Sequence, residues 1–311
     1  MPHLRYLLLS LLLIIALSGC EKIETTAFDA EIALGRWASG LESATVTVGD
    51  TEWAYLKNTW KDDQETVVLL HGFAANKDNW PRFAKALGDG YNIIAPDLPG
   101  HGDSSPDIKL AYDIDSQSRR VLSMLKALGI EKFHVAGNSM GGAIAARTAW
   151  IAPEKTLSVG LFNAAGVITK DNEFTTILRT GGKNPLIVHN PGEMANLLEW
   201  AMAKPPFMPW PIESVMERKS IARGDLNEKI FKDMIGDGTG TDLSAILPKV
   251  TAPTLVLWGD QDRLISVASA DVFISLMPNA RKVILPGIGH LPMMEAAEES
   301  AKHYSEFLSS H

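Results

Sequence analysis

Residues 137–141 read Gly-Asn-Ser-Met-Gly and place a serine between two glycines at the spacing of a nucleophile motif. A strand-like run ending at Ala136 precedes them, and an Ala-rich helical run follows from Gly142 to Trp150. This context would hold Ser139 at the apex of a sharp turn. Glycines lack Cβ atoms, so strand and helix can approach closely enough to keep the turn strained. The motif therefore predicts nucleophilic catalysis by Ser139.

A serine hydroxyl is a weak nucleophile unless a base takes its proton and a further group orients that base. The best candidate base is His290, in the run Gly-Ile-Gly-His directly after a strand-like segment, 283–285. We expect the loop there to deliver the imidazole to the edge of a sheet. His303 lies in a polar helical stretch, where we expect a surface position.

Two carboxylates could orient the imidazole. Residues 259–262 read Gly-Asp-Gln-Asp after the strand-like run 254–258, so Asp260 and Asp262 are both candidates. We expect Asp262 to reach the Nδ1–H of the histidine. Asp260, at the turn itself, would instead accept hydrogen bonds from backbone amides and hold the loop.

An attacked carbonyl develops negative charge, which two backbone N–H groups aimed at one point would stabilise. One is the N–H of Met140, directly after the serine and at the N-terminus of the expected helix. The other is the N–H of Phe73, in the run His-Gly-Phe after a strand-like segment. We expect His71 to have a structural role, with its ring bonded to the backbone of this loop.

Other chemistries have weaker support. A metal site at Asp97, His101 and Asp103 would need a second group of ligands, which this glycine-rich loop does not supply. The chain has no G-x-G-x-x-G run and no phosphate-binding loop lysine. We therefore expect neither a metal nor a cofactor.

Composition limits the class of partner. The chain has 311 residues, of which 46% are hydrophobic and 21% charged, which is typical of a globular protein with an ample core. Its net charge of −8 argues against electrostatic binding to nucleic acid or to an anionic lipid surface.

Residues 1–19 have the features of a signal peptide: Arg5 precedes an apolar run, Tyr6–Leu17, that is shorter than the roughly 20 residues of a spanning helix. The run Leu-Ser-Gly-Cys that ends at Cys20 resembles a bacterial lipobox, which implies lipidation of this cysteine. An ordinary secretory signal, or an uncleaved anchor with a buried thiol, is the alternative. We expect a lipid-anchored protein of the bacterial cell envelope that faces the periplasm. The outer membrane is favoured because Glu21, and not Asp, follows the cysteine.

The body alternates strands with helices, which predicts a doubly wound α/β sheet. Residues 20–43 would be a tether, and a hairpin follows in 44–57. Segments 44–165 and 248–311 would form the core, and residues 166–247 a helical cap over the carboxyl edge of the sheet. The cap is rich in Met and aromatic side chains, among them Phe207 and Trp210. We expect most of these in the core of the cap and about a third along a substrate tunnel. The expected core strands are 67–70, 93–95, 133–136, 159–162, 254–258 and 283–285, and the expected helices are 80–87, 114–128 and 143–150, with 193–203 and 212–222 in the cap.

Together these residues resemble the α/β-hydrolase superfamily from about residue 44 to the C-terminus. Gly-Asn-Ser-Met-Gly-Gly with an upstream His-Gly-Phe is similar to bacterial family V lipases and related membrane-attached lipases and phospholipases. The resemblance implies hydrolysis of acyl esters through an acyl-enzyme. It places Ser139, Asp262 and His290 on the family triad, with Phe73 and Met140 as its oxyanion donors.

The leading hypothesis is thus a carboxylic ester hydrolase acting on lipid-like esters. A serine hydrolase that cleaves carbon–carbon bonds of ring-fission products shares the triad and cap, but its anionic cytosolic substrates fit an exported lipoprotein badly. A non-catalytic binding protein on this fold is the third alternative, although such proteins tend to lose the nucleophile or the histidine.

Overall fold

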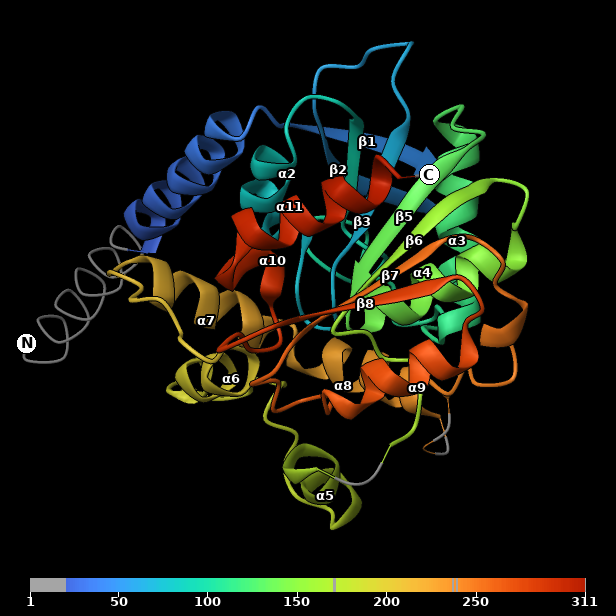
Figure 1. Cartoon of the computed structure of the whole chain (residues 1–311). Coiled ribbons are helices and arrows are strands. Elements are labelled where there is room, and N and C mark those ends of the chain that lie inside the picture. The colour runs from blue at the N-terminus through green and yellow to red at the C-terminus, as the bar shows by residue number, and fades with distance from the viewer. Residues whose placement is uncertain (1–20, 170–171, 237, 239, 311) are drawn as a thin grey trace, which may run out of the picture.

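The computed structural model describes residues 21–169, 172–236, 238 and 240–310, and its centre is one eight-stranded sheet (Figure 1). Across the sheet the strands follow the order β1-β2-β4-β3-β5-β6-β7-β8. β1 and β2 pair antiparallel, as does β2 with β4, and all other neighbours pair parallel. The expected hairpin and all six core strands are present, which confirms the α/β fold. Their bounds are β1 (Glu42–Val48), β2 (Thr51–Lys57), β3 (Thr66–Leu70), β4 (Asn92–Pro96), β5 (Phe133–Asn138), β6 (Thr156–Phe162), β7 (Thr254–Gly259) and β8 (Ala280–Leu285).

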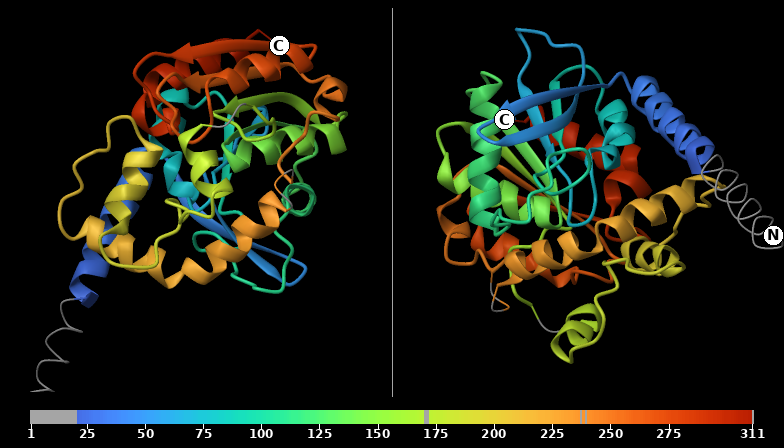
Figure 2. Two further views of the ribbon diagram at one scale, coloured as in Figure 1. Left: turned by 90° about the horizontal axis from the view of Figure 1, so that it is seen from below. Right: turned by 180° about the vertical axis from the view of Figure 1, so that it is seen from behind.

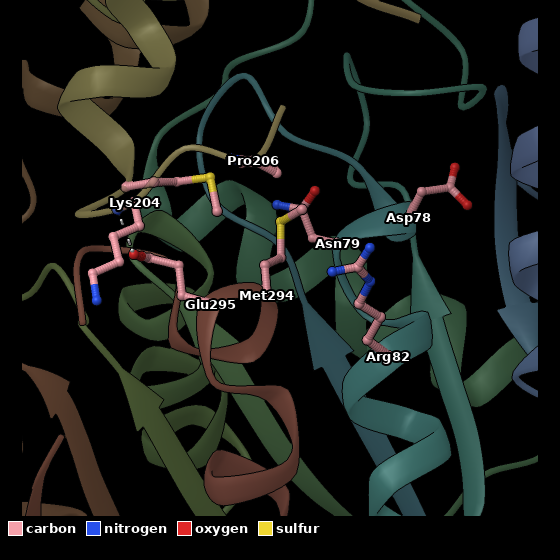
Figure 3. Close-up of a pocket in the computed structure, with 8 residues that line it drawn as sticks. Asp78, Asn79, Arg82, Lys204, Pro206, Met294 and Glu295 are labelled. Atoms are coloured by element: carbon pink, nitrogen blue, oxygen red, sulfur yellow. Dashed lines mark hydrogen bonds between the residues drawn. The ribbon is translucent and has the colours of Figure 1, made fainter. Parts of the chain in front are cut away.

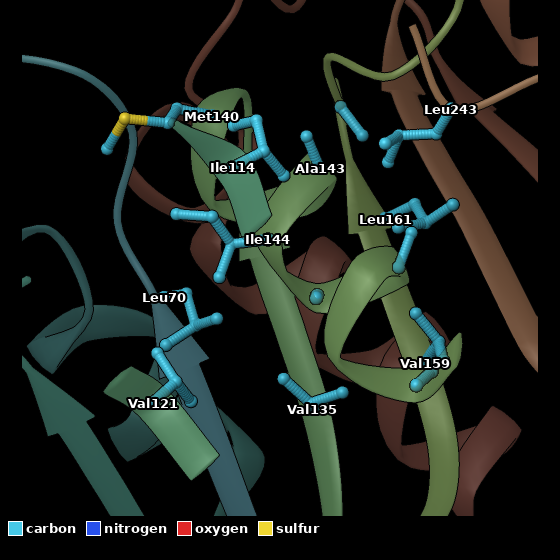
Figure 4. Packing of buried hydrophobic residues seen from close by; sticks show 14 of the residues in the cluster. Leu70, Ile114, Val121, Val135, Met140, Ala143, Ile144, Val159, Leu161 and Leu243 are labelled. Carbon is cyan, nitrogen blue, oxygen red and sulfur yellow. The ribbon is translucent and has the colours of Figure 1, made fainter. Parts of the chain in front are cut away.

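Helices cover both faces of the sheet, which explains why its central strands are continuous apolar runs. Side chains alternate between faces along a strand. Val67 and Leu69 of β3 therefore belong to the core beneath α2 (Pro81–Leu87) and α11 (Ala297–Leu308). Their neighbours Val68 and Leu70 belong to the larger core beneath α3 (Ile114–Ala127), α4 (Met140–Ile151) and α9 (Ala268–Leu276). Figure 4 shows this second core, in which Leu70 and Val135 of the sheet lie close to Val121 and Ile144 of the helices.

The described residues between β6 and β7 include four α-helices beyond one end of the sheet (Figure 1), and we call this segment the cap. It contacts the loops that follow the parallel strands at their carboxyl ends. Arg223 donates from Nη1 to the carbonyl of Gly100, 2.9 Å away, in the loop after β4. The guanidinium of Arg263, after β7, lies 4.3 Å from the ring centre of Trp200. The cap helices are α5 (Glu173–Arg179), α6 (Glu193–Ala201), α7 (Ile212–Ala222) and α8 (Gly224–Ile235).

Residues 21–38 of the segment expected to be a tether form a helix that packs against the body (Figure 2). Near its end, Arg36 makes two hydrogen bonds of 2.6 Å to the carboxylate of Asp78. Near its start, Phe28 is buried beneath Lys219 of α7, whose ammonium lies 4.4 Å from the ring centre. The helix is therefore attached to the core at one end and to the cap at the other.

The expected signal peptide and Cys20 lie outside the described residues. Within the described part of the chain, no helix combines the length and apolar character needed to cross a membrane.

Candidate active site

Ser139 stands at the turn between β5 and α4 with φ +54° and ψ −118°, a conformation that side-chain-bearing residues rarely adopt. The end of β6 holds this backbone on both sides. The N–H of Ser139 donates to the carbonyl of Phe162 at 3.1 Å, and the carbonyl of Ser139 accepts from the N–H of Ala165 at 2.9 Å. Surrounding structure of this kind is what lets a strained residue persist.

The flanking glycines are required because a side chain at either position would collide with neighbouring backbone. A Cβ atom on Gly137 would lie 2.1 Å from the carbonyl oxygen of Gly141. A Cβ atom on Gly141 would lie 2.3 Å from the carbonyl oxygen of Leu70. Strand and helix therefore approach as closely as the G-x-S-x-G pattern predicts.

Asp262 and His290 are brought together at the carboxyl ends of β7 and β8. Their contact joins Asp262 Oδ2 to His290 Nδ1 at 2.8 Å, and both side chains are buried. The other oxygen, Oδ1, accepts hydrogen bonds from the N–H groups of Leu264 at 2.8 Å and Ile265 at 3.0 Å. Because Nδ1 donates to the carboxylate, the lone pair of Nε2 is left to act as a base.

The two rejected candidates lie elsewhere. Asp260 Oδ1 accepts a hydrogen bond of 2.7 Å from the N–H of Gly287 and so joins the loops after β7 and β8. This matches the loop-holding role expected for it. His303 lies on α11, partly exposed, with Nδ1 3.7 Å from a carboxylate oxygen of Glu306.

Two asparagines that the sequence analysis did not single out connect the parts of the site. Asn163, with φ +45°, donates from Nδ2 to Asp262 Oδ2 at 2.7 Å and accepts at Oδ1 from the N–H of Gly259 at 3.2 Å. Asn138 donates from Nδ2 to the carbonyl of His290 at 2.9 Å. Asn138 ends β5, and Asn163 directly follows β6. A polar side chain at the carboxyl end of a buried parallel strand is the sequence signal that could have identified both.

The loop after β3 lies directly against Ser139. A Cβ atom on Gly72 would be 3.3 Å from the Cβ of Ser139, so the backbone that leads into Phe73 passes within contact distance of the serine. The ring of Phe73 packs 5.2 Å, centre to centre, from that of Phe231 in α8. Met140 is the first residue of α4, where backbone N–H groups have no partner within the helix.

His71 fixes this loop, as expected from the sequence. Its Nδ1 lies 2.7 Å from the carbonyl of Gly72, and its Nε2 accepts from the N–H of Leu98 at 2.9 Å. A ring that donates at Nδ1 and accepts at Nε2 is neutral. Complete burial favours this form and lowers the pKa of His71 to about 4.

With this geometry established, the chain can be compared with known proteins. Residues 67–303 match the family described as Alpha/beta hydrolase family. The chain belongs to the alpha/beta hydrolase family. This alpha/beta hydrolase is 33% identical to Lipase 1 of Psychrobacter immobilis over 86% of its own length and 84% of that protein.

Solved structures agree with this assignment. A crystal structure of a membrane phospholipase A, described as a bacterial virulence factor, is 38% identical, with a TM-score of 0.90 and 98% of each chain covered. A structure of a putative lipase from Acinetobacter baumannii AYE is 30% identical, with a TM-score of 0.84, and covers 91% of this chain and 96% of its own. The resemblance to bacterial lipases and membrane-attached phospholipases is therefore confirmed.

In this alpha/beta hydrolase, two carboxylates of the loop considered for a metal form ion pairs with a lysine. The buried ammonium of Lys77 lies 2.6 Å from Asp97 Oδ2 and 2.6 Å from Asp103 Oδ2. The backbone N–H of Lys77 also donates to Asp97 Oδ1 at 2.7 Å. The cluster joins the loop after β3 to the loop after β4. His101 is buried nearby, and burial lowers its pKa to about 3.

Glu295, at the end of α10 (Pro292–Glu295), is a further residue that the sequence analysis missed. Its Oε1 accepts from the N–H of Leu291 at 3.3 Å, and its Oε2 from the N–H of Gly289 at 3.2 Å, so it bonds the backbone on both sides of His290. Oε2 also accepts from the N–H of Ala203 in the cap at 2.8 Å. Glu295 and Lys204 line a cavity of about 330 Å³. Figure 3 shows the two residues side by side. The cap is thus tied directly to the histidine loop.

Proposed function

We propose that this alpha/beta hydrolase is a carboxylic ester hydrolase acting on lipid-like acyl esters, a lipase or esterase whose substrates include phospholipids or acylglycerols. The observation that carries the proposal is the buried pair of Asp262 and His290. The backbone carbonyl of His290 accepts a hydrogen bond from Asn138, the residue before the strained Ser139. Acyl-transfer catalysis by a serine at a strand–helix turn uses an imidazole base that a carboxylate orients.

In the proposed reaction Ser139 Oγ attacks the ester carbonyl carbon while His290 Nε2 takes the hydroxyl proton. Asp262 holds the imidazole in the required tautomer and stabilises its protonated form. The N–H groups of Phe73 and Met140 stabilise the oxyanion. The tetrahedral intermediate then collapses, the imidazolium protonates the departing alcohol, and an acyl-enzyme remains. Water, deprotonated by His290, releases the acid and restores the serine.

Substrate class is supported by the cap and by the relatives. The cap contributes buried Met194, Trp200 and Met202, and such side chains adapt to flexible apolar ligands. The cap also meets the histidine loop, where the N–H of His290 donates to the carbonyl of Ala201 at 3.0 Å. The curated relative is named as a lipase and the solved relative as a membrane phospholipase A. An acyl ester with a long apolar chain is the substrate that fits both observations.

We also propose that Cys20 is lipidated and holds the enzyme on a membrane of the cell envelope, facing the periplasm. Two or more acyl chains are needed for stable anchoring, which lipoprotein modification supplies. Mass spectrometry of the mature N-terminus tests this directly. A Cys20 without acyl mass, or a mature chain starting at another residue, would remove the anchor from the proposal.

The decisive experiment on activity compares Ser139→Ala with Ser275→Ala, an exposed serine on α9 that bonds only the carbonyl of Val272 in its own helix. Turnover of p-nitrophenyl esters and labelling by a fluorophosphonate probe should be lost in the first variant and kept in the second. Unchanged circular dichroism would show that Ser139→Ala still folds. Substantial turnover by Ser139→Ala would reject Ser139 as the nucleophile. A panel of triacylglycerols, phospholipids and lysolipids then ranks the substrates.

A further inference from the structure

The helix of residues 21–38 exposes an apolar stripe to solvent. Its members are spaced four, three, four and three residues apart, which places them on one helix face. The largest of them, Trp37, is 76% exposed. The opposite face holds the contacts to the body described above, so the exposed stripe has no role in packing the helix. The stripe consists of Ile23, Ala27, Ala30, Leu34 and Trp37.

The cap adds two exposed aromatic side chains. Phe207 is 91% exposed and Trp210 is 72% exposed, in the segment that joins α6 to α7. This segment runs beside the N-terminal helix in both views of Figure 2. They were expected within the cap core or along a tunnel, and the structure corrects that expectation.

These two groups form what we call the apolar face, defined by its large side chains Ile23, Leu34, Trp37, Phe207 and Trp210. Ion pairs join the N-terminal helix to α7, the helix that follows the aromatic segment, including one of 2.6 Å from Arg218 to Glu24. Five of the nine large apolar side chains that are exposed in the described part of the chain belong to this face. Large apolar side chains gain free energy when they leave water, so a face of this kind indicates an interaction surface.

The position of the face along the chain identifies its occupant. Its helix follows Cys20 directly, and the apolar run Tyr6–Leu17 lies just before that. A helix that starts at the bilayer surface and rises about 1.5 Å per residue would carry Trp37 some 24 Å away if it stood upright. Lying along the surface, it would bring the whole stripe into contact with lipid. Tryptophan and phenylalanine are suited to the boundary between headgroups and acyl chains.

We propose that the apolar face docks on the lipid bilayer, with the helix of residues 21–38 lying along the surface. This inference rests on the proposed membrane attachment and extends it, because it fixes the orientation of the enzyme. The segment that carries Phe207 begins at Ala203 and Lys204, which bond Glu295 beside the histidine loop. Docking therefore brings the cap side of the active site to the membrane, and an ester can pass from bilayer to enzyme without crossing water.

The test uses the full-length protein in lipid nanodiscs that hold one copy each. Trp37→Cys and Trp210→Cys, each labelled with an environment-sensitive fluorophore, are compared with Trp60→Cys, a tryptophan that is 43% exposed outside the face. Wild-type protein, treated with the same fluorophore, is the background control for labelling of Cys20. Probes at 37 and 210 should be quenched by spin-labelled lipids and protected from aqueous iodide, and the probe at 60 should behave oppositely. Iodide quenching at 37 and 210 equal to that at 60 would overturn the proposal. A second preparation, with two copies per disc, tests for self-association. Protection that appears there but is absent with one copy would also overturn the proposal and would identify a second chain as the occupant.

This readout does not depend on catalysis, so it stands if the ester hydrolase proposal fails. A kinetic arm adds the functional consequence. Trp37→Ser combined with Trp210→Ser should lower turnover of a bilayer-dispersed ester about tenfold and leave turnover of a soluble short-chain ester unchanged. The control Trp60→Ser should change neither. An equal loss on both substrates would contradict docking, because it would point to damage of the folded site.

Discussion

The side-chain amide of Asn138 donates a hydrogen bond of 2.9 Å to the backbone carbonyl of His290, across 152 positions of the chain. The same amide donates to the carbonyl of Phe162 at 3.0 Å. The residue before the proposed nucleophile therefore joins the ends of β5 and β6 to the loop that carries the proposed base. Ser139 and His290 are placed on one connected framework.

Asn138→Ala should lower kcat for a soluble ester by about a hundredfold, because the loop of His290 loses its attachment and small displacements of reacting groups are costly. Steady-state kinetics measure the change, and KM should move little. Asn279→Ala is the matched control, since that amide bonds the carbonyl of Thr251 at 2.7 Å in an exposed position. Equal rates for Asn138→Ala and the control would show that the attachment does not position the histidine.

Asp262→Asn should lower kcat by about ten-thousandfold, since an amide no longer fixes the tautomer or stabilises the imidazolium. Asp260→Asn keeps an acceptor oxygen for the N–H of Gly287 and should lower kcat by less than about tenfold. Kinetics of the two variants, with thermal melting as a check on folding, separate the roles. A loss in Asp260→Asn as large as that in Asp262→Asn would reverse the assignment of the acid.

Glu295→Gln should reduce kcat about tenfold, because an amide group that donates replaces one oxygen that accepts backbone N–H bonds around His290. Since the same carboxylate holds Ala203 of the cap, the loss should be greater for long acyl chains than for acetate esters. Rates across a series of chain lengths test this. The control is Glu299→Gln, an exposed carboxylate on α11. A loss that is the same at every chain length would argue against coupling between cap and histidine.

Stability should fall as the pH is lowered from about 6.5 to about 4. His71 has a pKa near 6.5 when unfolded and about 4 when buried, so in this window the unfolded chain binds a proton that the folded chain does not. Across this window His71 changes the free energy of unfolding by about 3 kcal/mol, and its contribution is constant above pH 6.5 and below pH 4. Urea unfolding at pH 7 and pH 5 measures the slope of the free energy of unfolding against pH. His303→Gln, at the surface, should keep it and His71→Asn should reduce it. An unchanged slope in His71→Asn would assign the effect to other groups.

Much of the architecture follows from local patterns. The elbow at 137–141, the strand before it and the helix after it are adjacent in sequence, so propensity and glycine spacing are enough to predict them. The loop of His290 and the two aspartates after β7 are positioned by strands whose carboxyl ends must share one edge. This is why the sequence predicts which segments meet there.

The partners of these groups were decided only by the tertiary structure. Asn163 reaches Asp262 across 99 positions, and Glu295 reaches Ala203 across 92, and no spacing rule relates such residues. Likewise, helical periodicity indicates that residues 21–38 have two faces but does not say which is covered. The apolar composition of the cap predicts burial of Phe207 and Trp210, but in the fold both side chains are exposed to solvent. Periodicity reports the shape of one segment, whereas burial depends on where every other segment packs.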